Sequence, residues 1–226
     1  MSYVKIIYLA VLICLCICIA SCDKAKHKTT SPIDADWEIS IRNTYNADWL
    51  KSTSFEIGIW WLGHSAISSA DVAEFFIDGS PYAIDTPVTD AMAYKGSAVL
   101  NFGQTYDIKF KFNGAEVINT SLQMPYQCDV SFPEYYQPSQ RKTLYWAMDH
   151  DNQAQYILVS SSCPDDNRKS KKYFTIPNAV RYFTIPENSV ETYEPLTYSE
   201  ITMIQSNEKY LNRVYLSASQ YTYKSY

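Results

Sequence analysis

The chain has 226 residues, of which 46% are hydrophobic and 15% aromatic, and its formal net charge is −5. This mildly acidic balance argues against nucleic acid as a partner. Tyrosine alone accounts for 20 residues, and this abundance of aromatic side chains favours β-strands, so we expect an all-β protein. The length allows one large domain or two small ones.

An apolar run opens the chain after a single basic residue, Lys5. Residues 6–20 contain no charge, glycine or proline. They are too few for a typical membrane-spanning helix, which needs about 20 apolar residues, but they have the length of a signal-peptide core. The run ends in two small residues, Ala20 and Ser21, followed by Cys22.

The stretch Ile19-Ala20-Ser21-Cys22 resembles the lipobox of bacterial lipoproteins, a family that prefers leucine at the position of Ile19. The resemblance implies that residues 1–21 are a signal peptide that is removed. It also implies that the Cys22 thiol carries a diacylglycerol and that the new amino terminus receives a further acyl chain, such as palmitate. Each buried methylene contributes about 0.8 kcal/mol, so two or more chains give stable anchoring. The alternatives are an ordinary cleaved signal peptide and an uncleaved anchor.

Residues 22–33 are polar and lack periodicity, so we interpret them as a flexible tether. The expected location is the cell envelope, lipid-anchored to a bacterial membrane, on either its periplasmic face or the cell surface. Of the six cysteines, only Cys128 and Cys163 remain once the leader is removed and Cys22 is lipidated. Two remaining thiols of an exported protein can pair, so we predict a Cys128–Cys163 disulfide. The alternative is two buried thiols.

Residues 34–125 show strand patterns and are expected to form an immunoglobulin-like β-sandwich. Apolar and polar residues alternate from Trp37, and a second apolar face runs from Phe55. Asp78-Gly79 and Asn113-Gly114 each follow an apolar run and predict tight hairpin turns.

Residues 126–226 restart the strand pattern over a length typical of a seven-stranded sandwich. Leu144-Tyr145-Trp146 is similar to the L-x-W of the second strand of fibronectin type III domains, and the stretch from Val180 to Pro186 looks like their middle strand and the turn after it. The resemblance implies a fibronectin type III-like β-sandwich. The expected fold class is therefore all-β, with two immunoglobulin-like antiparallel β-sandwich domains after the signal peptide and the tether.

The histidines offer two weak catalytic candidates, His64 beside Ser65 and His150 between Asp149 and Asp151. No Gly-x-Ser-x-Gly elbow, P-loop, His-Glu-x-x-His or calcium-loop motif is present. The sequence around His150 is also ordinary turn chemistry, because Asp and Asn cap their own backbone. We therefore expect no enzymatic activity, no metal site and no cofactor.

Aromatic residues give a stronger binding signal. If Trp61 lies in the core, Trp60 points to the other face of its strand, with Gly58 leaving room beside it. An exposed indole can stack on a sugar ring or a protein partner, although Trp60 could instead cover its own sheet. A second candidate surface on the last strand consists of Tyr215, Tyr221 and Tyr223, which share a face with serines. Such a face is typical of recognition surfaces, and also of routine cross-strand packing.

These patterns favour a lipid-anchored cell-envelope protein with a non-catalytic role in binding, adhesion or scaffolding. Its expected partners are the membrane, through the N-terminal lipid, and a protein or glycan that the sequence does not identify. A second hypothesis is a glycan-binding lipoprotein of a nutrient-uptake system. A third is a sandwich-fold hydrolase that uses His150 with Asp149 or Asp151.

Overall fold

A computed structural model describes residues 35–48, 53–63, 70–85, 93–163, 168–193 and 197–226. Regular secondary structure in these residues is β-strand throughout, which confirms the all-β class. None of the described residues belongs to a helix of the length and apolarity needed to cross a membrane. The signal peptide, the tether and Cys22 lie outside the described residues, so their assignments stay predictions.

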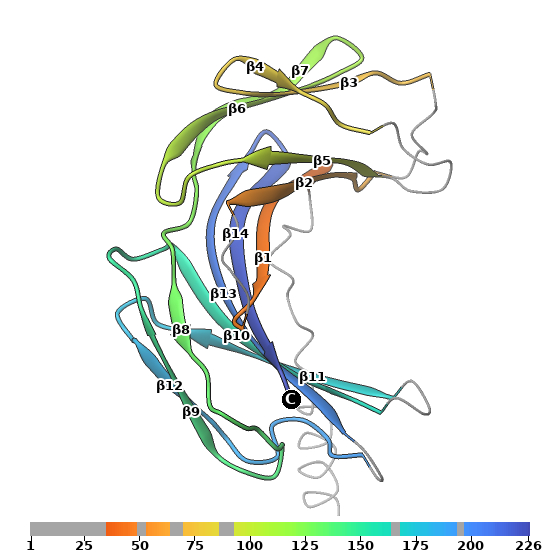
Figure 1. The fold of residues 1–226 in the computed structure, drawn as a ribbon. Coiled ribbons are helices and arrows are strands. Elements are labelled where there is room, and N and C mark those ends of the chain that lie inside the picture. Colours follow the sequence, from red (N-terminus) through yellow and green to blue (C-terminus); the bar gives the residue numbers. More distant parts are fainter. Residues whose placement is uncertain (1–34, 49–52, 64–69, 86–92, 164–167, 194–196) are drawn as a thin grey trace, which may run out of the picture. The chain divides into compact units, whose positions relative to one another are not determined.

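The strands form three sheets (Figure 1). Their bounds are β1 (Trp37–Asn46), β2 (Ser54–Trp61), β3 (Ala73–Ile77), β4 (Ser80–Tyr82), β5 (Ala93–Val99), β6 (Thr105–Phe112), β7 (Ala115–Gln123), β8 (Asp129–Ser131), β9 (Lys142–Ala147), β10 (Ala154–Ser162), β11 (Lys169–Ile176), β12 (Tyr182–Ile185), β13 (Tyr198–Leu211) and β14 (Val214–Ser225). A seven-stranded sheet has the order β11-β10-β13-β14-β1-β2-β5. A four-stranded sheet has the order β4-β3-β6-β7, and a three-stranded sheet has the order β12-β9-β8.

Residues with positive φ make the tight hairpin turns. Asp78-Gly79 joins β3 to β4 with φ values of 49° and 74°, and Asn113-Gly114 joins β6 to β7 with 50° and 76°. Positive φ at both central residues matches the twist of the flanking strands, and both predicted turns are confirmed. A third such turn, Asn212-Arg213, joins β13 to β14 with φ values of 50° and 61°; the sequence analysis did not identify it.

The first core lies between the four-stranded sheet and one part of the seven-stranded sheet. Trp37, Ile39 and Ile41 alternate into it from β1, as the sequence predicts. Val214 and Leu216 of β14 also belong to this core, although they lie at the other end of the sequence. A second core lies between the three-stranded sheet and β10, β11 and β13.

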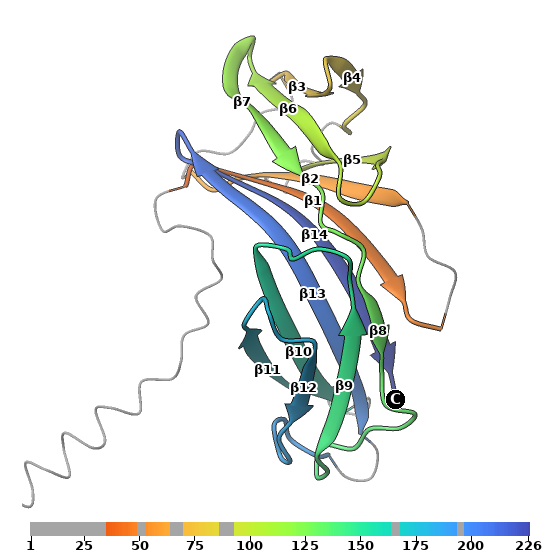
Figure 2. The same ribbon diagram turned by 90° about the vertical axis from the view of Figure 1, so that its left-hand side faces the viewer.

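The seven-stranded sheet joins the residues on both sides of position 125. β14 pairs with β1 in parallel, with Trp37 opposite Val214 and Asn46 opposite Tyr223, and it pairs with β13 antiparallel. β13 and β14, of 14 and 12 residues, form a ribbon that passes both smaller sheets (Figures 1 and 2). Both sandwiches are therefore built against one continuous sheet.

Between the two cores, buried amides take the place of apolar side chains on the inner side of β10, β13 and β14 and in the residues just before β10. We call these buried residues the amide belt: Asn152, Gln155, Gln205, Asn207 and Gln220. Gln220 Oε1 accepts a hydrogen bond from the Cys128 backbone N–H at 3.0 Å, and Gln220 Nε2 donates to the Tyr45 hydroxyl at 3.0 Å. That hydroxyl donates in turn to the Cys128 carbonyl at 3.1 Å.

Asn152 and Asn207 hold the segment that connects the two sandwiches. Asn152 Oδ1 accepts from the Tyr126 backbone N–H at 2.7 Å, and Asn152 Nδ2 donates to the Tyr126 carbonyl at 3.2 Å and to Gln205 Oε1 at 3.1 Å. Asn207 Nδ2 donates to the Met124 carbonyl at 3.3 Å. The belt thus satisfies backbone groups of residues 124–128 that would otherwise be buried without partners.

Replacing Gln220 with leucine tests this role. Gln220→Leu removes the hydrogen bonds of the Gln220 amide to the Cys128 N–H and the Tyr45 hydroxyl, so we expect the free energy of unfolding to fall by about 2–4 kcal/mol. Urea unfolding measures the change. Gln127→Leu, in the same segment but with an exposed side chain, is the matched control and should change it by less than about 0.5 kcal/mol. Equal losses in the two variants would contradict the role of the belt.

Candidate functional site

The outer face of the seven-stranded sheet carries hydroxyl, charged and aromatic side chains, whereas both smaller sheets pack on the inner face. We call this outer face the polar face. The strand register forms three neighbouring rows across β2, β1 and β14. In that strand order, the rows are Trp60, Glu38 and Tyr215; Gly58, Ser40 and Ser217; and Glu56, Arg42 and Ser219. Tyr221 and Tyr223 continue it along β14, opposite Thr44 and Asn46. The predicted site residues of β2 and β14 thus share one surface.

Trp60 lies on the polar face because its neighbour Trp61 packs toward the first core. The ring centroids of Trp61 and Trp37 are 4.8 Å apart, on the inner side of the sheet. The six-membered ring of Trp60 extends back along β2 over Gly58, where an added Cβ would lie only 2.1 Å from its Cη2 atom. Gly58 therefore gives the indole the space that the sequence predicts.

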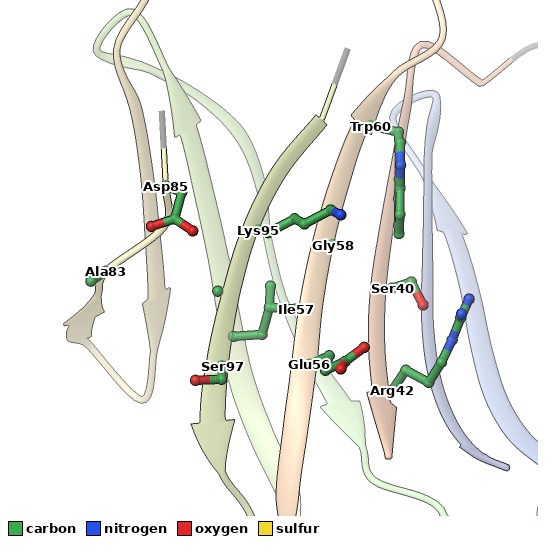
Figure 3. A pocket seen from close by; sticks show the side chains of 11 residues that line it. Ser40, Arg42, Glu56, Ile57, Gly58, Trp60, Ala83, Asp85, Lys95 and Ser97 are labelled. Atoms are coloured by element: carbon green, nitrogen blue, oxygen red, sulfur yellow. The ribbon is translucent and has the colours of Figure 1, made fainter. Parts of the chain in front are cut away.

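A cleft of about 700 Å³ opens beside Trp60 (Figure 3). Its polar lining includes Ser40, Arg42, Glu56, Asp85, Lys95 and Ser97. These side chains come from β1, β2, β5 and the segment after β4, and Figure 3 shows the Lys95 side chain reaching across toward Gly58. Arg42 and Glu56 are direct cross-strand partners. The cleft thus offers donors and acceptors beside one aromatic ring.

Arg42 connects the cleft to the tyrosines of β14. Its guanidinium carbon lies 4.7 Å from the ring centroid of Tyr221, a cation–π arrangement. Its Nε atom is buried and has no hydrogen-bond partner among the described residues. Burial also raises the pKa of the Tyr221 hydroxyl, an effect that the Arg42 charge opposes.

The three predicted tyrosines differ in exposure. Tyr215 is 9% exposed, and its backbone pairs with Glu38 and Tyr210. Tyr221 and Tyr223 are half-buried. Tyr221 and Tyr223 are therefore the ones with side-chain surface left for a partner.

Of the two histidine candidates, only His150 lies within the described residues. His64 and Ser65 lie outside the described residues. The His150 ring packs against Tyr126, with centroids 4.7 Å apart, and Asp151 forms an ion pair with Arg181. No cluster of three potential metal-ligating side chains occurs within the described ranges.

The predicted Cys128–Cys163 disulfide is wrong: both residues are buried thiols. Cys128 Sγ lies 3.6 Å from the side-chain nitrogen of Gln205, which is opposite Gln155 near the start of β10. Cys163 follows the other end of β10, eight residues after Gln155 and therefore roughly 26 Å from it along the strand. A disulfide requires Cα atoms within about 7 Å, so the length of β10 keeps the two thiols apart.

An exposed tyrosine pair on the three-stranded sheet escaped the sequence analysis. Tyr145 of β9 and Tyr182 of β12 are direct cross-strand partners, are 58% and 59% exposed, and have ring centroids 6.3 Å apart. The alternation around Trp146 shows that Tyr145 faces outward, but only the strand pairing reveals Tyr182 as its neighbour. The sequence pattern also did not predict that Asp85 and Lys95 line the cleft, because only the pairing of distant segments brings them beside Trp60.

No protein-family model and no curated protein matches the chain. Among solved structures, it is similar to the adhesin InvE of Yersinia pseudotuberculosis, with a TM-score of 0.26 and 7% sequence identity. The similarity covers 83% of this chain and 58% of the InvE chain, which is less than two thirds of that chain's length. A likeness this weak does not bear on function.

Glu38 gives the polar face a pH-dependent stability. Burial raises the pKa of its carboxyl above the ordinary value of 4.5, and the Arg42 charge opposes the shift. A raised carboxyl pKa means that burying the ionised form destabilises the fold at pH values above that pKa. The penalty disappears below pH 4.5, where the carboxyl is protonated in both states.

Glu38→Gln should therefore raise the melting temperature at pH 7, and the gain should shrink as the pH falls through the raised pKa toward 4. Thermal unfolding of both proteins at the two pH values measures this difference. Glu187→Gln, at an exposed position, serves as the control. A gain that is the same at pH 7 and pH 4 would contradict desolvation of Glu38.

Proposed function

We propose that this chain is a lipid-anchored protein of the bacterial cell envelope with a non-catalytic role in binding, for adhesion or scaffolding, and that it binds through the polar face. The observation that carries the proposal is the difference between the two faces of the seven-stranded sheet. Its inner face supports both cores, while its outer face leaves the aromatic side chains of Trp60 on β2 and of Tyr221 and Tyr223 on β14 partly exposed.

Such a surface suits recognition for a physical reason. Tyrosine supplies a large contact area with few rotatable bonds, and its hydroxyl can hydrogen-bond to a partner. Aromatic residues are also enriched at interfaces relative to the rest of a protein surface. The polar face therefore has the composition of a binding surface, and the sheet beneath it holds that surface in place.

The lipid anchor rests on the sequence around Cys22. We expect the mature wild-type protein to start at Cys22 with added acyl mass and to remain with the membrane fraction. Cys22→Ser should lose the acyl mass, because a hydroxyl cannot form the thioether. Intact-mass spectrometry and membrane fractionation measure both properties.

Cys18→Ser is the matched control, since Cys18 lies in the part of the leader that is removed; this variant should be acylated like the wild type. An unacylated wild-type protein would remove the anchor from the proposal.

Binding through the polar face is tested with the detergent-solubilised lipoprotein and detergent-washed envelope fragments of the source bacterium. We expect the protein to co-sediment with the fragments. The double variant Tyr173→Ser/Tyr223→Ser should weaken binding to the fragments at least five-fold. Both tyrosines lie in one cross-strand row of the polar face, remote from Trp60.

Tyr145→Ser/Tyr182→Ser is the control, since it removes two tyrosines that are more exposed but lie on a different sheet. Absence of co-sedimentation, or an equal loss in the control, would overturn binding through the polar face.

A further inference from the structure

We propose that the cleft beside Trp60 binds a neutral saccharide. The inference rests on the proposed function, because it assigns a ligand class to one part of the polar face. It concerns the cleft itself, which lies at the opposite end of that face from Tyr173 and Tyr223.

The indole supplies the first element of such a site. Its six-membered ring is held over Gly58, and side chains of β1, β2 and β5 surround it. The faces of an aromatic ring are electron-rich, so they attract the slightly positive C–H groups on one side of a pyranose ring. A substituent at position 58 would displace the ring, so Gly58 and Trp60 act as one unit.

The charges of the cleft select for a neutral ligand with many hydroxyl groups. Arg42 and Lys95 provide hydrogen-bond donors, and Glu56 and Asp85 provide acceptors. Because the two signs balance, an anion such as phosphate would meet two carboxylates, and an apolar ligand would strip water from four charges without replacing their hydrogen bonds. Sugar hydroxyls donate and accept, so they can satisfy both kinds of group.

Arg42 is arranged to donate into the cleft. Stacking on Tyr221 fixes its guanidinium, and its buried Nε lacks an acceptor among the described residues. Because Nε is buried, the terminal guanidinium nitrogens are the Arg42 atoms that can donate to a ligand oxygen in the cleft. Fixing the side chain beforehand also reduces the entropy lost on binding.

The volume fits a small ligand or a short part of a longer chain. At about 700 Å³, the cleft lies within the usual range of small-molecule sites. The exposed Tyr145–Tyr182 pair is the rival platform for a sugar. However, the polar groups beside it are Thr143 and Thr184, whose hydroxyls bond to each other at 2.9 Å, so the pair offers far fewer directed hydrogen bonds.

Affinity electrophoresis of the detergent-solubilised full-length lipoprotein tests the proposal. The probes are neutral polysaccharides (soluble starch, mixed-linkage β-glucan, mannan and xylan) and the anionic polygalacturonate. We expect at least one neutral probe to retard the protein, with affinity at least ten-fold weaker for Trp60→Ala and Arg42→Gln. Trp60→Phe, which keeps a ring, should retain part of the affinity, and Tyr145→Ser/Tyr182→Ser should retain all of it.

Three results would overturn the proposal. The first is no retardation by any neutral probe, and the second is retardation by polygalacturonate only. The third is retardation that persists in Trp60→Ala but is lost in Tyr145→Ser/Tyr182→Ser. Melting temperatures within a few degrees of wild type establish that the variants are folded. If the protein still co-sediments with envelope fragments but no neutral probe retards it, the saccharide assignment fails and the proposed function stands. Loss of both results would reject both.

Discussion

The hydrogen bonds between the amide belt and residues 124–128 are the constraint on which the rest of the structure depends. The connection between the sandwiches crosses the inner face of the β13–β14 ribbon, where its backbone groups are shielded from water. A buried backbone group without a partner destabilises a fold by about 1–3 kcal/mol. Gln220 and Asn207, both buried on the ribbon, supply partners to the backbone groups of Cys128 and Met124.

The belt also fixes how the ribbon serves two cores. On β14, Val214 and Leu216 precede Gln220, and on β13, Ile201 and Met203 precede Gln205. Shifting either strand by one residue would turn every one of these side chains to the opposite face. An amide in the belt would then leave its bonding partners, so the polar residues and the apolar ones specify the same register. The polar face owes its rows of aligned side chains to this register.

Local sequence patterns predicted the parts of the fold that depend on neighbouring residues. The Asp78-Gly79 and Asn113-Gly114 turns follow from backbone preferences, and the outward direction of Trp60 follows from two adjacent tryptophans on one strand. Pairings between distant segments were not predictable in this way. The parallel β1–β14 pair, the contribution of Asp85 to the cleft and the separation of Cys128 from Cys163 all depend on register across the sheet, which no local periodicity encodes.

The parallel pairing of β1 with β14 has a consequence for how the protein folds. Trp37 and Val214 are partners across 177 residues, so the first core stays incomplete until the last strand has formed. The chain must lose the entropy of closing this long loop before the contacts between β1 and β14 can stabilise it. Topologies dominated by such long-range contacts fold slowly. During that interval Ile39 and Ile41 lack their neighbours on β14, and the unpaired edge of β1 is open to association with other chains. In a chain with this topology, the edge of β1 therefore stays open to such association until β14 has paired with it.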